Sequence, residues 1–390
     1  MITRQTDESI ANQIAMVVIL LMAIGTVFVF SASATILQEF DLRRFYSFLS
    51  FRQLLFFPLA VIVMYIFSAF NYRWFSAERG WFKSPAAYML ALSVGLLMLV
   101  LIPRVGTEIN FARRWLRIPA GPISISFQPS ELAKWTIIFF LAAFGDRYAS
   151  TMDSYRKRFV PACIVIVAVV GLIITQDLGT AAFISLLSFI ILIISGARFW
   201  HVLTLMPAGI LGFLFILVHS PGRMQRLAAF IEPEKWAGSS AYQASQSLIA
   251  LGSGGLMGKG LGMGISKYGH LPEDTTDFVF AIIGEELGLV GTIAVILLFV
   301  MFIWLGVLVV IRCKDRFGQI LAAGIVLAIG IQAALNIGVV TVVLPTKGIP
   351  LPFVSSGGTG MLLAAAAVGV LLNIAQHPWP HELPQVLETQ

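Results

Sequence analysis

The sequence has few charged residues and very few cysteines and histidines. Of its 390 residues, 12% are charged and 58% are hydrophobic. A soluble protein of this size could not keep so much apolar surface away from water, so the composition excludes that class. The cysteines, Cys163 and Cys313, stand outside any pair motif, and the five histidines are scattered. These residues therefore predict neither a disulfide nor a metal site.

Apolar stretches of about 20 residues recur along the chain, which is typical of transmembrane helices. The sequence predicts an all-α polytopic membrane protein with about ten spans and both termini on one side. It shows no repeat and no separate soluble domain, so residues 1–390 are predicted to form a single integral membrane domain. The predicted spans are 11–33, 52–70, 86–103, 129–146, 159–175, 179–196, 201–218, 284–311, 319–343 and 359–376.

Basic residues indicate the orientation only weakly. With both termini in the cytoplasm, the inner loops hold twelve Lys and Arg residues and the outer segments hold eight. The long loop 219–283, between the seventh and eighth spans, adds five more and removes the bias when it is counted. The positive-inside rule thus slightly favours cytoplasmic termini. An outer face this basic suggests an anionic ligand there, such as phosphate.

An acidic segment at the end of the long loop is the strongest functional signal. Residues 271–288 contain five carboxylates and no Lys or Arg, and an apolar run follows at once. Asp277 stands where a polar loop meets this apolar helix, so partial desolvation would suit its carboxylate to general-base chemistry. An N-terminal cap of the helix is the alternative role for Asp277. Glu285 lies about 80° around a helix from Asp277, roughly on the same side, whereas Glu286 points away and suits packing.

Glu131 and Lys134 stand three residues apart within the fourth predicted span. That spacing places both on one helical face, where they can pair. Charged residues inside a span usually face a bundle interior or a water-filled cavity. A structural ion pair and a functional polar site both fit this pattern.

Two further segments could contact an anion or a headgroup. Arg113, Arg114 and Arg117 flank Trp115 in the outer segment 104–128, which suits a pyrophosphate or, alternatively, a simple interfacial anchor. Residues 252–264 include seven glycines, so their backbone could approach a ligand closely or act as a flexible hinge. Asp177 precedes the sixth span and suits a helix cap.

Six motifs resemble those of one known family. The chain resembles the SEDS family (shape, elongation, division and sporulation), the FtsW and RodA class of bacterial peptidoglycan polymerases. Three residues outside the acidic segment depart from the family pattern: Phe111, Gln176 and Ser356. The Pro-Thr-Lys-Gly motif at 345–348 is more similar to the division type, FtsW, than to the elongation type, RodA. The matching segments are 112–118, 127–134, 177–181, 242–262, 271–288 and 344–358.

The resemblance implies a location, a reaction and partners. It implies ten transmembrane helices in the bacterial cytoplasmic (inner) membrane, cytoplasmic termini and an extracytoplasmic 219–283 loop. It also implies that lipid II, a disaccharide-pentapeptide on undecaprenyl pyrophosphate, is polymerised into β-1,4 glycan strands. The family's catalytic aspartate falls on Asp277. Expected partners are a class B penicillin-binding protein, which is a transpeptidase, and membrane proteins of the division complex, but no nucleic acid.

The chemistry requires a base and a stabiliser of negative charge. A carboxylate can take the proton of the acceptor 4-hydroxyl as it attacks the anomeric carbon, and one displacement inverts an α-linked donor to a β product. Arg, Lys or a divalent cation such as Mg²⁺ or Mn²⁺ must stabilise the departing pyrophosphate. The candidates for this role are Arg113, Arg114, Lys259 and Lys347. Glu131, Lys134 and Glu285 are predicted to support the site.

Two other functions remain open from the sequence. A lipid II flippase would need charges along a path through the bilayer, whereas the acids cluster at one face. A scaffold that only recruits a transpeptidase would not need Asp277. The sequence therefore favours polymerisation at the outer surface.

Overall fold

The computed structural model describes residues 2–33, 49–78, 80–109, 112–120, 123–232, 235, 241–267 and 276–377. Residues 271–275, with Glu273 and Asp274 of the acidic segment, lie outside this part of the chain. Helices dominate the described ranges. The α-helices are α1 (Ile2–Ser33), α2 (Leu49–Ala69), α3 (Pro85–Leu101), α4 (Pro129–Arg147), α5 (Val160–Ile174), α6 (Leu178–Ile194), α7 (Phe199–Val218), α8 (Pro221–Ile231), α9 (Tyr242–Gly254), α10 (Val279–Arg312), α11 (Arg316–Val340) and α12 (Gly358–Gln376).

Each predicted span overlaps one helix among α1–α7 and α10–α12. Within the described residues, seven helices are long and apolar enough to cross a membrane, while α3 and α6 are apolar but have 17 residues each. At 1.5 Å per residue, 17 residues extend about 25 Å, less than a ~30 Å hydrocarbon core. Helix α4 carries charges at both of its ends, among them Glu131 and Arg147. The polytopic helical fold is thus confirmed, whereas length and composition do not establish ten crossings.

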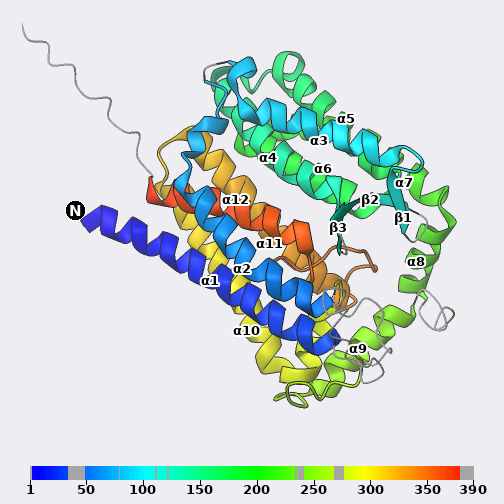
Figure 1. The fold of residues 1–390 in the computed structure, drawn as a ribbon. Coiled ribbons are helices and arrows are strands. Elements are labelled where there is room, and N and C mark those ends of the chain that lie inside the picture. Colours follow the sequence, from blue (N-terminus) through cyan, green and yellow to red (C-terminus); the bar gives the residue numbers. More distant parts are fainter. Residues whose placement is uncertain are drawn as a thin grey trace, which may run out of the picture.

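Two groups of helices form the bundle (Figure 1). Helices α1, α2, α10, α11 and α12 pack against one another, and α3, α4, α5 and α6 form the second group. The groups meet where α4 and α6 pack against α11. A Cβ on Gly324 would lie 2.6 Å from the Ile138 side chain, so this glycine lets α11 approach α4 closely. Helix α11 is therefore central to the bundle and can position residues from both groups.

Within its described residues, the long loop contains helices α8 and α9. In Figure 1, α7, α8 and α9 follow one another along one edge of the molecule. Helix α7 is apolar and exposes large side chains such as Leu211 and Phe215, so these must face lipid in a membrane. Helix α9 packs against α10 and α11. The long loop thereby returns from the edge of the bundle to the beginning of α10.

A three-stranded antiparallel sheet lies between α3 and α4, where the sequence predicted only a loop. Its strands β1 (Gly106–Ile109), β2 (Ala112–Ala120) and β3 (Ile123–Phe127) pair in the order β1-β2-β3. Strand β3 reads Ile-Ser-Ile-Ser-Phe, an alternation with the period of a strand. This short alternation was the available signal for the sheet, which replaces the predicted loop and adds strands to an otherwise helical fold.

Helix α10 begins at Val279, five residues before the predicted span, and is kinked at Gly288. The glycine has φ of 67° and ψ of −159°, outside the helical region. A Cβ at this position would lie 2.4 Å from the Gly258 nitrogen. Gly288 therefore bends the helix, and its missing side chain leaves room for the glycine-rich segment to pack against α10.

Candidate functional site

Asp277 lies in the turn that leads into α10 and is partly buried. The residue at the helix cap position is Phe278, so Asp277 stands one residue before the cap. The side-chain amide of Asn336 in α11 donates a 2.8 Å hydrogen bond to the Asp277 carbonyl. A Cβ built on Gly348 would lie 3.2 Å from Asp277 Oδ2. The carboxylate is thus next to the loop between α11 and α12.

This loop, residues 341–357, contains Lys347, which lies close to a second carboxylate, that of Asp177. The Lys347 side chain packs on the beginning of α6, since a Cβ on Gly179 would meet its Cδ at 3.5 Å. Burial lowers the pKa of Lys347, while the negative charge of Asp177 acts in the opposite direction. Lys347 is therefore a cation that is held out of bulk water between Asp177 and the Asp277 turn.

Asp177 organises the basic residues around it. Its Oδ1 accepts a 3.0 Å hydrogen bond from the Thr180 backbone, which confirms the predicted cap of α6. Its Oδ2 pairs with Arg114 Nη1 at 3.2 Å, and Arg114 Nε donates to the Gln176 carbonyl at 2.9 Å. The three-stranded sheet is thereby attached to the beginning of α6.

Arg223 of α8 joins this cluster, and the sequence analysis did not single it out. Its guanidinium donates a 2.9 Å hydrogen bond to the Thr175 carbonyl. Burial first, and the nearby Arg114 second, lower the pKa of Arg223. The only sequence signal was a pair of arginines, Arg223 and Arg226, three apart in a short amphipathic segment. We call Arg114, Arg223 and Lys347 the cation cluster; its three positive charges surround the single carboxylate of Asp177.

Two other predicted anion-binding residues are engaged elsewhere. Arg113 pairs through Nε with Glu108 at 3.3 Å, and both side chains are exposed. The pairing of β1 with β2 passes from Thr107–Trp115 to Glu108–Arg113, so Arg114 is the extra residue of a β-bulge. Lys259 Nζ pairs with Glu285 Oε1 at 2.7 Å. The structure thus brings together Arg114 and Lys347 of the four candidates.

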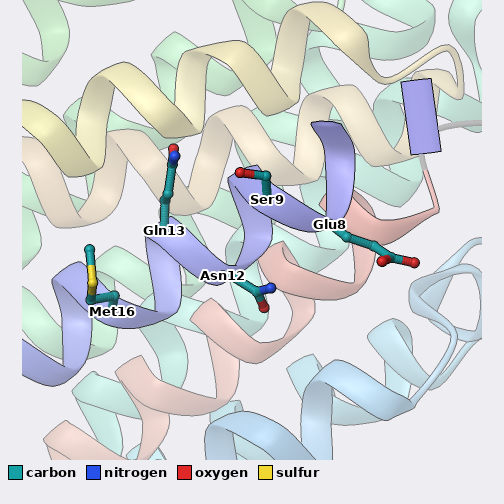
Figure 2. A pocket seen from close by; sticks show the side chains of 5 residues that line it. All are labelled: Glu8, Ser9, Asn12, Gln13 and Met16. Atoms are coloured by element: carbon teal, nitrogen blue, oxygen red, sulfur yellow. The ribbon is translucent and has the colours of Figure 1, made fainter. Parts of the chain in front are cut away.

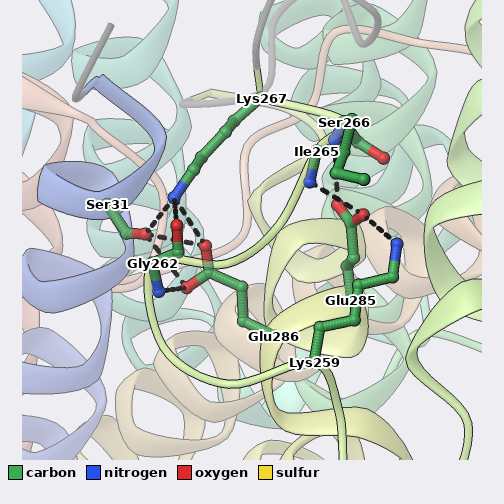
Figure 3. Close-up of polar contacts among 8 residues, drawn as sticks. All are labelled: Ser31, Lys259, Gly262, Ile265, Ser266, Lys267, Glu285 and Glu286. Atoms are coloured by element: carbon green, nitrogen blue, oxygen red, sulfur yellow. Dashed lines mark hydrogen bonds and ion pairs between the residues drawn. The ribbon is translucent and has the colours of Figure 1, made fainter. Parts of the chain in front are cut away.

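Glu285 and Glu286 hold the glycine-rich segment against α10 (Figure 3). Glu285 also accepts hydrogen bonds from the backbone of Ile265 and Ser266 at 3.0 and 3.1 Å. Glu286 pairs with Lys267 at 2.9 Å and accepts from Ser31 of α1 at 2.8 Å. Both carboxylates are buried. The basic partners missing from the acidic segment are therefore supplied by residues 259 and 267, and this arrangement favours an anchored segment over a hinge.

The predicted Glu131–Lys134 pair forms inside the bundle. Lys134 Nζ lies 2.7 Å from Glu131 Oε2, and the lysine is 3% exposed. The same ammonium donates to Gln332 Oε1 of α11 at 2.9 Å. The pair therefore links α4 to α11 through Gln332. This glutamine stands about one helical turn before Asn336, which contacts Asp277.

No group of three or more His, Cys, Asp or Glu side chains gathers into a metal-ligand set among the described residues. Mg²⁺ is often held by one or two carboxylates together with substrate phosphates, so a cation that arrives with a pyrophosphate needs no such set. Asp277 and Asp177 are the carboxylates in this region that could assist it.

An open hollow lies near the beginning of α1, lined by Glu8, Ser9, Asn12, Gln13 and Met16 (Figure 2). None of the residues around Asp277 contributes to it. Ser31, which contacts Glu286 and Lys267, is about 28 Å further along the helix than Asn12 at 1.5 Å per residue.

The profile of the FtsW/RodA/SpoVE family, described as "Cell cycle protein", matches residues 11–378. The chain belongs to this family. It is 37% identical over 379 residues to stage V sporulation protein E of Bacillus subtilis, covering 97% of this chain and 99% of that one. It is 38% identical over 361 residues to the probable peptidoglycan glycosyltransferase FtsW of Coxiella burnetii, covering 91% and 93%.

Two solved structures have the same fold. A chain of a peptidoglycan synthase complex matches with a TM-score of 0.71 and 22% identity, over 94% of this chain and 97% of that one. The rod shape determining protein RodA of Thermus thermophilus matches with a TM-score of 0.62 and 24% identity, over 93% and 95%. These likenesses support the polytopic membrane fold over nearly the whole chain.

Proposed function

We propose that this protein is a peptidoglycan glycosyltransferase that polymerises lipid II, with Asp277 as its catalytic base. The observation that carries the proposal is the position of the Asp277 carboxylate against Gly348, next to Lys347 of the cation cluster. A base and a set of cations on neighbouring elements are what transfer of a sugar from a pyrophosphate requires. Relatives named as probable peptidoglycan glycosyltransferases FtsW support the same activity.

The reaction follows from these groups. Asp277 accepts the proton of the acceptor sugar's 4-hydroxyl while that oxygen bonds to the donor's anomeric carbon. The bond from this carbon to the pyrophosphate oxygen breaks, and its electron pair leaves with undecaprenyl pyrophosphate. Arg114, Arg223 and Lys347 stabilise the charge on the departing group. A single displacement inverts the anomeric centre, which turns an α-linked donor into a β-1,4 product.

The proposal includes an orientation, a process and partners. Both termini lie in the cytoplasm and the site faces outward, which the small excess of inner-loop Lys and Arg supports. Cell division is the proposed process, and the several relatives named FtsW support it. A class B penicillin-binding protein is the proposed partner, because a structural neighbour belongs to a complex that coordinates polymerisation with crosslinking.

Purified protein should convert lipid II into glycan strands in detergent. The pyrophosphate bond already supplies the driving force, so the reaction needs no nucleotide and no ion gradient. The assay would combine the full chain, a transpeptidase partner, Mg²⁺ or Mn²⁺ and a β-lactam that blocks crosslinking, with strand length measured on gels. Detergent removes the two compartments that a flippase needs. Absence of polymer under these conditions, together with lipid II translocation in sealed vesicles, would replace the proposal with a flippase.

Arg223→Gln should reduce polymerisation while the exposed neighbour Arg226→Gln should not. A single group that stabilises developing charge is commonly worth about 10²-fold or more. Because Arg114 and Lys347 stay in place, we expect a loss of about 10²-fold or less in kcat/KM. The initial rate of strand formation against lipid II concentration measures it. Equal rates for the two variants would remove Arg223 from the cation cluster's role.

A further inference from the structure

The side-chain amide of Asn336 joins the two segments that carry the proposed base and the cation beside it. Asn336 Nδ2 donates to the carbonyl of Asp277 at 2.8 Å and to the carbonyl of Ile349 at 2.8 Å. Asn336 is 1% exposed. Both neighbours are carbonyl oxygens, so the amide nitrogen rather than the oxygen must face them. One NH₂ group thus connects these two backbones directly.

A second amide on the same face of α11 holds the next carbonyl of the loop. Gln332 stands four residues before Asn336, which places the two side chains one above the other. Gln332 Nε2 donates to the Pro350 carbonyl at 2.9 Å, while its Oε1 accepts from Lys134. The carbonyls of residues 349 and 350 thus both end on α11.

The loop has little regular structure of its own at this point. The Ile349 nitrogen donates to the Lys347 carbonyl at 2.9 Å, a turn of three residues, and Pro350 has no N–H to donate. Hydrogen bonds from α11 therefore hold this part of the loop in place, as backbone hydrogen bonds hold a strand or a helix. Loss of the Asn336 bridge therefore removes a direct connection between the Asp277 turn and the Lys347 segment.

We infer that Asn336 is a positioning residue, which sets the distance between the Asp277 carboxylate and Lys347 through their backbones and touches no sugar itself. The inference rests on the proposed polymerase function. Misplacement of a catalytic group by about 1 Å can cost on the order of 10²-fold in rate. Loss of the bridge should therefore lower turnover much more than it weakens binding of lipid II.

The chain contains a matched control for the structural part of this effect. Asn373, at the end of α12, is also buried at 3% exposure. Its Nδ2 donates to the Ser68 carbonyl at 2.8 Å, and its Oδ1 accepts from the Tyr72 nitrogen at 3.0 Å. Loss of either asparagine leaves buried backbone groups unpaired and should destabilise the protein. Asn336 bridges to the site, whereas these contacts of the Asn373 side chain join α12 to residues at and just after the end of α2.

The test compares Asn336→Ala with Asn373→Ala in the full chain with its transpeptidase partner. Thermal unfolding in detergent gives the folded fraction, and strand synthesis gives kcat and KM for lipid II. We expect both variants to melt at lower temperature. Per folded molecule, Asn336→Ala should lose about 10²-fold in kcat with KM changed less than about threefold, and Asn373→Ala should keep wild-type values.

A second variant covers the case in which Asn336→Ala does not fold. Asn336→Ser keeps one donor but is too short to bridge both carbonyls, so it should show the same fall in kcat at a temperature where it is folded. Wild-type kcat per folded molecule in the variant that folds, or an equal fall in Asn373→Ala, would overturn the inference. Failure of the wild-type protein to make polymer, or full activity of Asp277→Asn, would instead overturn the proposed function.

Discussion

Asp277→Asn is expected to reduce lipid II polymerisation by about 10²–10⁴-fold, the usual range for loss of a general base. Asparagine has nearly the size of aspartate but cannot take up the proton of the acceptor hydroxyl. The bond from Asn336 reaches the main-chain carbonyl of residue 277, so the variant keeps its backbone anchor. Strand synthesis by purified protein, with thermal unfolding measured on the same sample, would show a loss of activity without a loss of fold.

Asp153→Asn provides the control for removing a carboxylate. Asp153 lies beyond the far end of α4, where it is exposed and pairs with Arg198. This variant should polymerise lipid II at the wild-type rate. Near-normal strand yield from Asp277→Asn would show that residue 277 is not the base, and the mechanism would then have to place that role elsewhere.

Lys134→Met is expected to lower the free energy of unfolding by about 3 kcal/mol, the lower end of the range for breaking a buried ion pair. The change leaves the Glu131 carboxylate without its cation and Gln332 Oε1 without its donor. Glu131 keeps some contact with solvent, which is why we choose the lower end. The double variant Glu131→Gln with Lys134→Met should recover much of the loss, because no charge is then left alone.

An exposed pair with the same spacing provides the comparison. Lys235 Nζ lies 2.6 Å from Glu232 Oε2, and the two side chains are 71% and 52% exposed. Because surface pairs contribute about 0–1 kcal/mol, Lys235→Met should leave stability almost unchanged. Denaturant or thermal unfolding in detergent would measure both. A melting curve for Lys134→Met identical to wild type would contradict the burial of the pair.

Features that depend on local patterns could be predicted from the sequence. Continuous apolar runs located the long helices because each must satisfy its backbone within itself in lipid. The spacing of Glu131 and Lys134 was enough to predict their pairing, since both residues stand on one helix. Asp177 as a cap of α6 was likewise a local feature.

Features that depend on which segments meet in space could not be predicted. The ion pairs Lys259–Glu285 and Lys267–Glu286 join the glycine-rich segment and the residues directly after it to α10, and no local pattern specifies that contact. Arg113 and Arg114 were equivalent candidates until the structure paired Arg113 with Glu108 and Arg114 with Asp177. Asn336 is one amide among the residues of an apolar helix, and its role became visible only through its two carbonyl partners.

The two buried glutamates of α10 have a consequence for local motion. A segment with so many glycines would by composition exchange its backbone amides with solvent rapidly. Yet the amides of Gly262, Ile265 and Ser266 all donate to Glu285 or Glu286. These amide protons can exchange only when the carboxylates lose their partners, so residues 259–267 should open together with the beginning of α10 as one cooperative unit. Deuterium uptake there would thus report the integrity of the α10 kink rather than the flexibility of glycine.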